Sequence, residues 1–216
     1  SNGCIANFQS RSDLDAIATR NGVSIVWLSG KPLPTRNWNV NGYCCGEAAR
    51  LKVDDLAYVD AVMRAVHAQG LNPRSVITAG VSLGATMALT TACRRSSYVD
   101  GAISASGSAP SGCRPDHPLS LIAVGGTSDM ALGRSMPKRI ANAWRTTATT
   151  CPNPPTYEYT ERRRTILWTD CSNDTVVRVV SLVGIVHVWP HFSFYSLDDE
   201  VLALALGRLG RDRAQP

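Results

Sequence analysis

A serine between two glycines stands where a strand-like run of this sequence gives way to a helix-like one. Residues 75–79 are rich in β-branched side chains, and the small residues from 83 to about 93 are typical of a buried helix. The junction reads Gly80-Val81-Ser82-Leu83-Gly84. A sharp strand-to-helix turn of this kind exposes its serine at the carboxyl edge of a sheet, where open α/β folds bind their ligands.

Short β-branched runs alternate with helical stretches over the rest of the chain. This alternation predicts an α/β fold with a mainly parallel sheet and helices on both faces. With 216 residues and 44% hydrophobic content, we expect residues 1–216 to form a single domain with a sizeable core. The expected strands are 23–28, 75–79, 102–106, 121–124, 165–168 and 176–183, the expected helices are 13–20, 53–69, 83–93, 139–147 and 198–209, and 32–52 is expected to be a loop.

Charge and hydropathy argue against two kinds of partner. The 22 basic side chains exceed the 17 acidic ones, which gives +5, and the densest basic cluster is Arg162-Arg163-Arg164. No aromatic residues interleave with this cluster, so we expect a solvated surface turn, with a patch for an anionic partner as the alternative and no nucleic acid. No apolar run reaches the roughly 18 residues of a membrane span. We therefore expect no membrane span.

Seven cysteines are many for a reducing cytosol. None of them forms the CxxC pair that is typical of metal sites, so we expect an oxidising, extracellular location and no metal. Cys151 and Cys171, if paired, would close a loop worth about 3 kcal/mol of chain entropy.

The other bridges cannot be assigned from spacing alone. We expect them to join Cys44 and Cys45 to Cys93 and Cys113, which leaves Cys4 as the odd cysteine. Free buried thiols are the alternative. The chain as given shows no signal peptide, so export is inferred from the cysteines and not from an address.

A serine hydroxyl is a poor nucleophile at neutral pH, so it needs a histidine base and a group that orients the base. His187 follows the expected strand 176–183 and is placed to be the last member of a Ser, Asp, His series. His67 lies within an expected helix and His117 precedes a strand, so both are poorly placed, whereas His191 is a nearby competitor.

The acid of such a triad is expected at the same edge of the sheet. Asp129 ends Gly125-Gly126-Thr127-Ser128-Asp129, which directly follows the expected strand 121–124. Taken alone, it would more often be a turn aspartate that satisfies local N–H groups. Asp170 and Asp174 are weaker candidates because they flank Cys171 in what reads as a turn.

Several segments taken together resemble the polyhydroxybutyrate depolymerase and feruloyl esterase family of secreted α/β hydrolases. The resemblance runs from about residue 13 to about residue 190, and the order of the segments is more specific than any one of them. The segments are Trp38-Asn39, Cys44-Cys45-Gly46, Asp54-Asp55, Gly80-Val81-Ser82-Leu83-Gly84-Ala85, Gly126-Thr127-Ser128-Asp129, Cys151, Cys171 and His187-Val188-Trp189-Pro190.

The resemblance implies an α/β-hydrolase fold and a serine esterase with Ser82, Asp129 and His187 as its triad. The backbone N–H of Leu83 is expected to contribute to the oxyanion hole. No cofactor is expected, and the chain is expected to be a monomer. The implied substrates are polyhydroxyalkanoate-type polyesters or oligomers, or feruloyl-type esters of plant cell walls. Trp189 and Trp38 are the candidates for lining the substrate pocket.

The sequence departs from this family in two places. Ile185-Val186-His187 stands where relatives usually have Gly-Gly-His, which could alter the loop that presents the histidine. Relatives also carry a strand ending in His-Gly ahead of the segment matching residues 1–4, and it lies between the strands matching 23–28 and 75–79. We therefore expect an N-terminally incomplete chain or a rearranged sheet. A vacant slot would leave backbone groups unpaired, at about 1 to 3 kcal/mol for each buried group, and would remove the loop that supplies the second oxyanion donor.

Other readings of the same motifs remain open. The glycine-flanked serine could form a turn without chemistry or a turn that holds a phosphate. A non-catalytic secreted binding protein built on a degraded hydrolase scaffold is the alternative from another functional class. Acyl transfer to an alcohol or sugar would use the same triad and differ only in the acceptor pocket.

Overall fold

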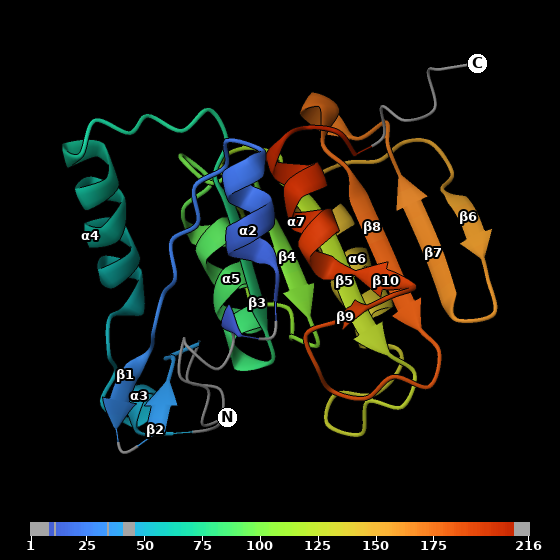
Figure 1. The fold of residues 1–216 in the computed structure, drawn as a ribbon, viewed down its shortest axis with the longest axis horizontal. Coiled ribbons are helices and arrows are strands. Elements are labelled where there is room, and N and C mark those ends of the chain that lie inside the picture. Colours follow the sequence, from blue (N-terminus) through green and yellow to red (C-terminus); the bar gives the residue numbers. More distant parts are fainter. Residues whose placement is uncertain (1–8, 11, 34, 41–45, 210–216) are drawn as a thin grey trace.

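A six-stranded sheet forms the centre of the molecule in the computed structural model, which describes residues 9–10, 12–33, 35–40 and 46–209 (Figure 1). The strand order is β3-β4-β5-β8-β7-β6. The first four strands run parallel, and β7 and β6 are antiparallel to their neighbours. The strands are β3 (Ile77–Val81), β4 (Gly101–Ala105), β5 (Ser120–Gly126), β6 (Thr156–Tyr159), β7 (Arg163–Trp168) and β8 (Val177–Leu182).

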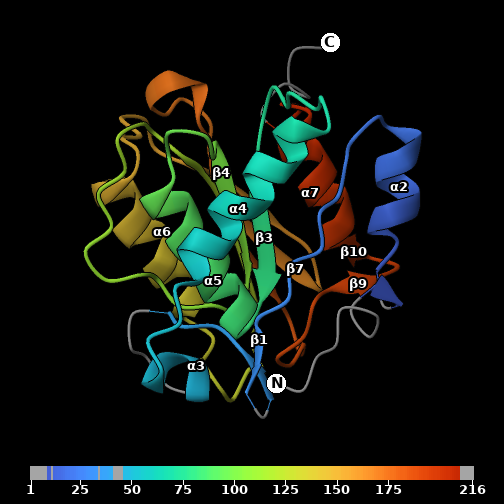
Figure 2. The ribbon, with the colours of Figure 1, turned by 90° about the vertical axis from the view of Figure 1, so that its left-hand side faces the viewer.

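Helices cover both faces of this sheet (Figures 1 and 2). The helices α5 (Leu83–Arg94) and α6 (Met136–Thr147) pack on one face, while α2 (Leu14–Arg20) and α7 (Leu197–Ala205) pack on the other. All five residues of β4 are buried, as expected for a parallel strand covered on both sides. The predicted fold class is confirmed. The smaller elements are α3 (Glu47–Arg50), the hairpin β1 (Lys31–Leu33) and β2 (Thr35–Asn37), the 3₁₀ turn η1 (Ser172–Asp174), β9 (His191–Phe192) and β10 (Tyr195–Ser196).

The sheet ends at β3, and the expected strand at 23–28 is wrong. Residues 23–30 are not in a strand, because β3 pairs with β4 alone and no neighbouring strand is present to pair with this segment within the described chain. A cavity of about 430 Å³ lies between residues 23–30 and β3, and its lining includes residues 23–30 and 75–81. The vacant slot that the family resemblance implies is therefore present as an apolar cavity along the whole of β3.

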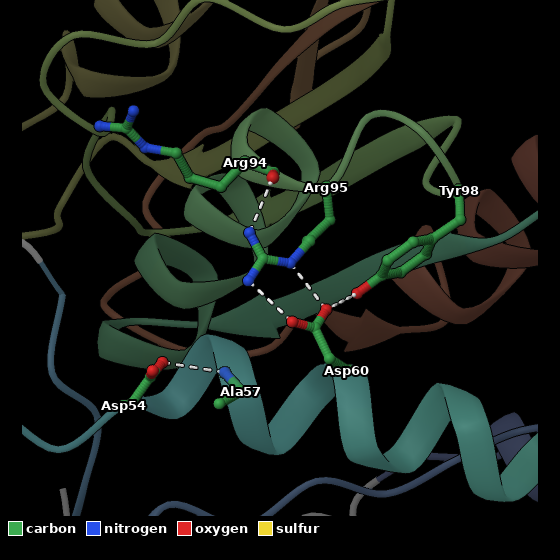
Figure 3. A network of polar contacts seen from close by, with 6 residues as sticks. All are labelled: Asp54, Ala57, Asp60, Arg94, Arg95 and Tyr98. Carbon is green, nitrogen blue, oxygen red and sulfur yellow. Dashed lines mark hydrogen bonds and ion pairs between the residues drawn. The ribbon is translucent and has the colours of Figure 1, made fainter.

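Helix α4 (Asp55–Ala68) lies beyond β3 (Figure 1) and contributes to the lining of this cavity. Its Asp60 accepts two hydrogen bonds from the Arg95 guanidinium, at 2.6 and 2.8 Å, and one from the Tyr98 hydroxyl at 2.8 Å (Figure 3). The hydrogen bonds from Arg95 lower the pKa of Asp60 more than partial burial raises it. This network ties α4 to the end of α5.

Two disulfides pin the face that α5 and α6 cover. Cys151 pairs with Cys171, as predicted, and Cys93 pairs with Cys113. The expectation that Cys93 and Cys113 bond to Cys44 and Cys45 is therefore wrong. Cys93, in the last turn of α5, lies 5.6 Å from Cys113 between Cα atoms. Cys4, Cys44 and Cys45 lie outside the described residues.

Three further predictions concern the loop at 32–52, the basic cluster and a membrane span. The expected loop at 32–52 contains the β1–β2 hairpin and α3. In the basic cluster only Arg162 lies in a turn, since Arg163 and Arg164 begin β7, and Arg163 pairs with Glu158. No helix in the described part of the chain is long and apolar enough to cross a membrane.

Candidate active site

Ser82 occupies a strained turn between β3 and α5. Its φ of 57° and ψ of −125° lie in the left-handed half of backbone space, which costs a side-chain-bearing residue about 1 to 3 kcal/mol. The Ser82 N–H donates to the Ala105 carbonyl at 2.9 Å, which fixes the turn against the end of β4. A Cβ on Gly80 would lie 2.4 Å from the Gly84 backbone, so only glycine permits the helix to leave the strand this closely.

Asp129 and His187 form a hydrogen-bonded pair at the same edge of the sheet. Asp129 follows β5 and His187 follows β8, and these strands are parallel neighbours. The His187 Nδ1 lies 3.0 Å from the Asp129 Oδ2. The Asp129 side chain is 3% exposed and that of His187 is 29% exposed. The carboxylate is thus buried behind an imidazole that keeps an open side.

The second oxygen of Asp129 is held by the backbone. Its Oδ1 accepts from the N–H groups of Ala131 at 2.9 Å and Leu132 at 3.0 Å. Burial alone would raise the pKa of Asp129, but hydrogen bonds from Leu132, the Ser106 hydroxyl and His187 outweigh it and lower the pKa. The carboxylate is therefore kept ionised and oriented toward His187.

Ser106 is a site residue that the sequence analysis missed. It follows β4, between the strands that lead to Ser82 and Asp129, and has a φ of 52°. Its side chain helps to lower the pKa of Asp129. The available signal was its place before Gly107 at the end of an expected strand.

The loop that carries His187 lies directly against the end of β5. A Cβ on Gly126 would lie 1.9 Å from the Ile185 carbonyl oxygen, so glycine is required for this approach. Ile185 accepts from the Ser128 N–H at 3.0 Å, and the Gly184 N–H donates to the Thr127 hydroxyl at 2.9 Å. Because Ile185 packs on the core and Val186 is exposed, the bulkier residues before His187 still leave it hydrogen-bonded to Asp129.

The competing acids and bases lie elsewhere. Asp170 and Asp174 precede β8, at the opposite edge of the sheet from Asp129. His67 ends α4 and hydrogen-bonds to the Leu71 carbonyl at 3.1 Å. His191 Nδ1 lies 2.9 Å from Asp198 Oδ2. Within the described chain, His187 is the histidine hydrogen-bonded to the acid predicted from sequence.

The nucleophile candidate and this pair share one edge of the sheet. Ser82, Asp129 and His187 follow the parallel strands β3, β5 and β8. The Ser82 hydroxyl makes no hydrogen bond to another described residue. Asp129 and His187 are thus in direct contact, whereas Ser82 is placed at the same edge of the sheet by the order of the strands.

The apolar cavity reaches the same turn. It is lined by Gly80, Val81 and Leu83 around Ser82, and also by both tryptophans predicted to line a substrate pocket. Trp38 stacks on Tyr58 with ring centroids 6.3 Å apart, and the Trp189 indole N–H donates to Asp198 at 2.9 Å. Leu83 begins α5, and a first-turn N–H has no acceptor within its own helix.

Comparison with solved structures assigns the fold. The structure is similar to that of acetyl xylan esterase from Aspergillus awamori, with a TM-score of 0.66 and 12% identity over 95% of this chain and 85% of that chain. Two variants of SOBER1 from Arabidopsis thaliana have TM-scores of 0.58 at 14% identity, over 91% and 93% of this chain and 90% and 92% of theirs. The fold is that of an α/β hydrolase. No known protein family and no curated protein matches the sequence.

Proposed function

We propose that this protein is a serine esterase that cleaves carboxylic esters through an acyl-enzyme. The observation that carries the proposal is the hydrogen bond between the buried Asp129 and His187, at the sheet edge where Ser82 has a strained, positive-φ backbone. A strained serine turn and an oriented imidazole are the two parts that nucleophilic catalysis requires.

The chemistry follows from the orientation of the imidazole. Because His187 Nδ1–H donates to Asp129, Nε2 carries the lone pair and can accept a proton from Ser82. Ser82 Oγ then bonds to the ester carbon, and the oxyanion of the tetrahedral intermediate receives the Leu83 N–H. The ester C–O bond breaks as the imidazolium protonates the departing alcohol. Water, deprotonated by His187, next attacks the acyl carbon. The bond between that carbon and Ser82 Oγ breaks, the acid leaves, and the imidazolium returns its proton to Ser82 Oγ.

The cavity supports an apolar or aromatic group on the substrate. It has a volume of about 430 Å³, reaches Gly80 and Leu83 beside Ser82, and is lined by Trp38 and Trp189. Polyhydroxyalkanoate-type oligomers and feruloyl-type esters both offer such a group. The solved structure of acetyl xylan esterase is named for an acetyl ester of xylan, which is consistent with the second class. The two disulfides are compatible with secretion.

The test is hydrolysis of p-nitrophenyl acetate and p-nitrophenyl butyrate by the wild-type protein and by Ser82→Ala. We expect Ser82→Ala to lose nearly all turnover while retaining the wild-type fold by circular dichroism. Thr86→Ser is a matched control, because Thr86 lies one turn along α5 and keeps its hydroxyl. Equal turnover by Ser82→Ala and the wild-type protein would refute the proposal. No turnover by the wild-type protein would instead favour a non-catalytic binding protein.

A further inference from the structure

The loop that carries His187 is fastened on both sides of that residue. Before it, Gly184 and Ile185 are held by the segment that follows β5. After it, Trp189 and His191 converge on one carboxylate, that of Asp198. The first fastening belongs to the site already described, whereas the second has no role in the proposed chemistry.

Asp198 is a buried carboxylate with three donors. Its side chain is 0% exposed. Its Oδ1 accepts from the Trp189 indole N–H at 2.9 Å. Its Oδ2 lies 2.9 Å from His191 Nδ1 and accepts from the Asp13 backbone N–H at 2.8 Å. A buried carboxylate is costly unless its oxygens are satisfied, so these contacts are mutually dependent.

The position of Asp198 in the fold is rigid. It is the second residue of α7, whose Leu197 and Val201 pack into the core. The Leu197 N–H also donates to the Pro190 carbonyl at 2.9 Å. The Asp13 contact adds the start of α2, which lies beside α7 (Figure 1). Asp198 therefore connects the His187 loop to two helices on one face of the sheet.

We propose that Asp198 is a positioning residue, which fixes His187 against Asp129 by holding Trp189 and His191. The catalytic value of this positioning rests on the proposed function, whereas the contacts of Asp198 do not. His187 is two residues from Trp189, so release of that indole frees the chain on the carboxyl side of the imidazole. The Gly184 and Ile185 contacts, and the hydrogen bond from the Leu197 N–H to the Pro190 carbonyl, would still restrain the loop but would no longer act within two residues of the imidazole on its carboxyl side.

The test uses Asp198→Asn, with Asp199→Asn as the matched control. Asp199 is the next residue of α7, is exposed, and carries the same charge. Asp198→Asn keeps one acceptor oxygen but turns an amide N–H₂ toward groups that donate hydrogen bonds in the wild-type protein. We expect kcat on p-nitrophenyl acetate to fall about 10- to 100-fold with KM little changed, as for a misplaced catalytic group. We expect Asp199→Asn to match the wild-type protein.

A second measurement does not depend on activity. The ring N–H proton of His187 is observed by NMR on protein labelled with ¹⁵N-histidine and is assigned by its absence in His187→Gln. We expect this resonance to persist in Asp199→Asn and to broaden or disappear in folded Asp198→Asn. Trp189→Phe removes the indole N–H donor, together with part of the ring, and leaves the Asp198 carboxylate in place. It therefore tests the same contact should Asp198→Asn fail to fold, and it should also weaken the resonance.

The outcomes separate this inference from the proposed function. A wild-type resonance and wild-type kcat in folded Asp198→Asn or Trp189→Phe would overturn the positioning role. An inactive wild-type protein whose His187 resonance depends on Asp198 would support the positioning role and refute the esterase. Additive effects of Asp198→Asn and Trp189→Phe on the resonance and on kcat would also overturn it, because residues that act through one contact are coupled.

Discussion

The two acidic residues that matter most for His187 have different tasks. Asp129 touches the imidazole itself and is kept ionised by backbone N–H groups, Ser106 and His187. Asp198 touches the neighbours of His187 along the chain and is fully buried. The imidazole is thus oriented by one carboxylate and its loop is fastened by the other.

The lowered pKa of Asp129 makes a prediction about stability in acid. Because the folded-state pKa lies below that of the unfolded chain, Asp129 stabilises the protein above the ordinary carboxyl range, near pH 4, and this contribution is lost as the pH falls through the lowered pKa. Asp129→Asn should reduce the free energy of unfolding at pH 7 by about 2 to 3 kcal/mol. Urea unfolding at pH 7, 5 and 3 should show this difference shrinking in acid. A difference that does not change with pH would contradict the assignment.

Placement along the chain was enough to predict that Asp129 and His187 lie together at one edge of the sheet. Asp129 and His187 each follow a run that forms a central parallel strand, so strand order alone brings them together. Ser106 and Asp198 could not be predicted in this way. Ser106 acts through a local backbone conformation, and Asp198 through a contact with Trp189 that depends on how α7 packs against the loop.

Strand β3 is the edge strand of the described sheet, with one strand beside it. Its central residue Ala79 is exposed and lines the cavity, whereas Ala102, in the adjacent β4, is 0% exposed. The same residue type thus lies in a parallel strand at both positions, but it borders a cavity at Ala79 and a filled core at Ala102.

This contrast predicts opposite effects of the same substitution. Ala79→Val should be neutral or should stabilise by up to about 1 kcal/mol, because valine favours strands and here has space. Ala102→Val should destabilise by about 1 to 3 kcal/mol, because it overpacks a filled core. Urea unfolding of both variants checks the prediction. Equal destabilisation by both would show that the cavity beside β3 is filled in solution.

The absence of a second strand beside β3 in the described chain explains the main error in predicting elements from sequence. Residues 23–28 have a strand-like composition, but a strand requires a partner, and none lies beside them in the described chain. Strand β6 was missed for the converse reason. Its residues 157–159 are exposed, so no buried run marks the strand in the sequence, and its conformation comes from pairing with β7.

At the scale of the whole molecule, the sheet gathers residues that lie far apart along the chain. The parallel strands β3, β4, β5 and β8 end at one edge, and each is followed by Ser82, Ser106, Asp129 or His187 in that order. The disulfides and the network around Asp60 hold the surrounding helices. The site is thus a property of the fold, and no segment of the chain forms it alone.

Reaction with a fluorophosphonate, followed by mass spectrometry of the resulting peptides, tests most directly whether these strand ends create a reactive serine. A fluorophosphonate bonds only to a serine whose proton has an acceptor. We expect one adduct, on Ser82, which forms in the wild-type protein and is lost in a folded His187→Gln variant. An adduct that forms on Ser82 at the same rate without His187, or an unmodified Ser82 in the wild-type protein, would contradict this expectation.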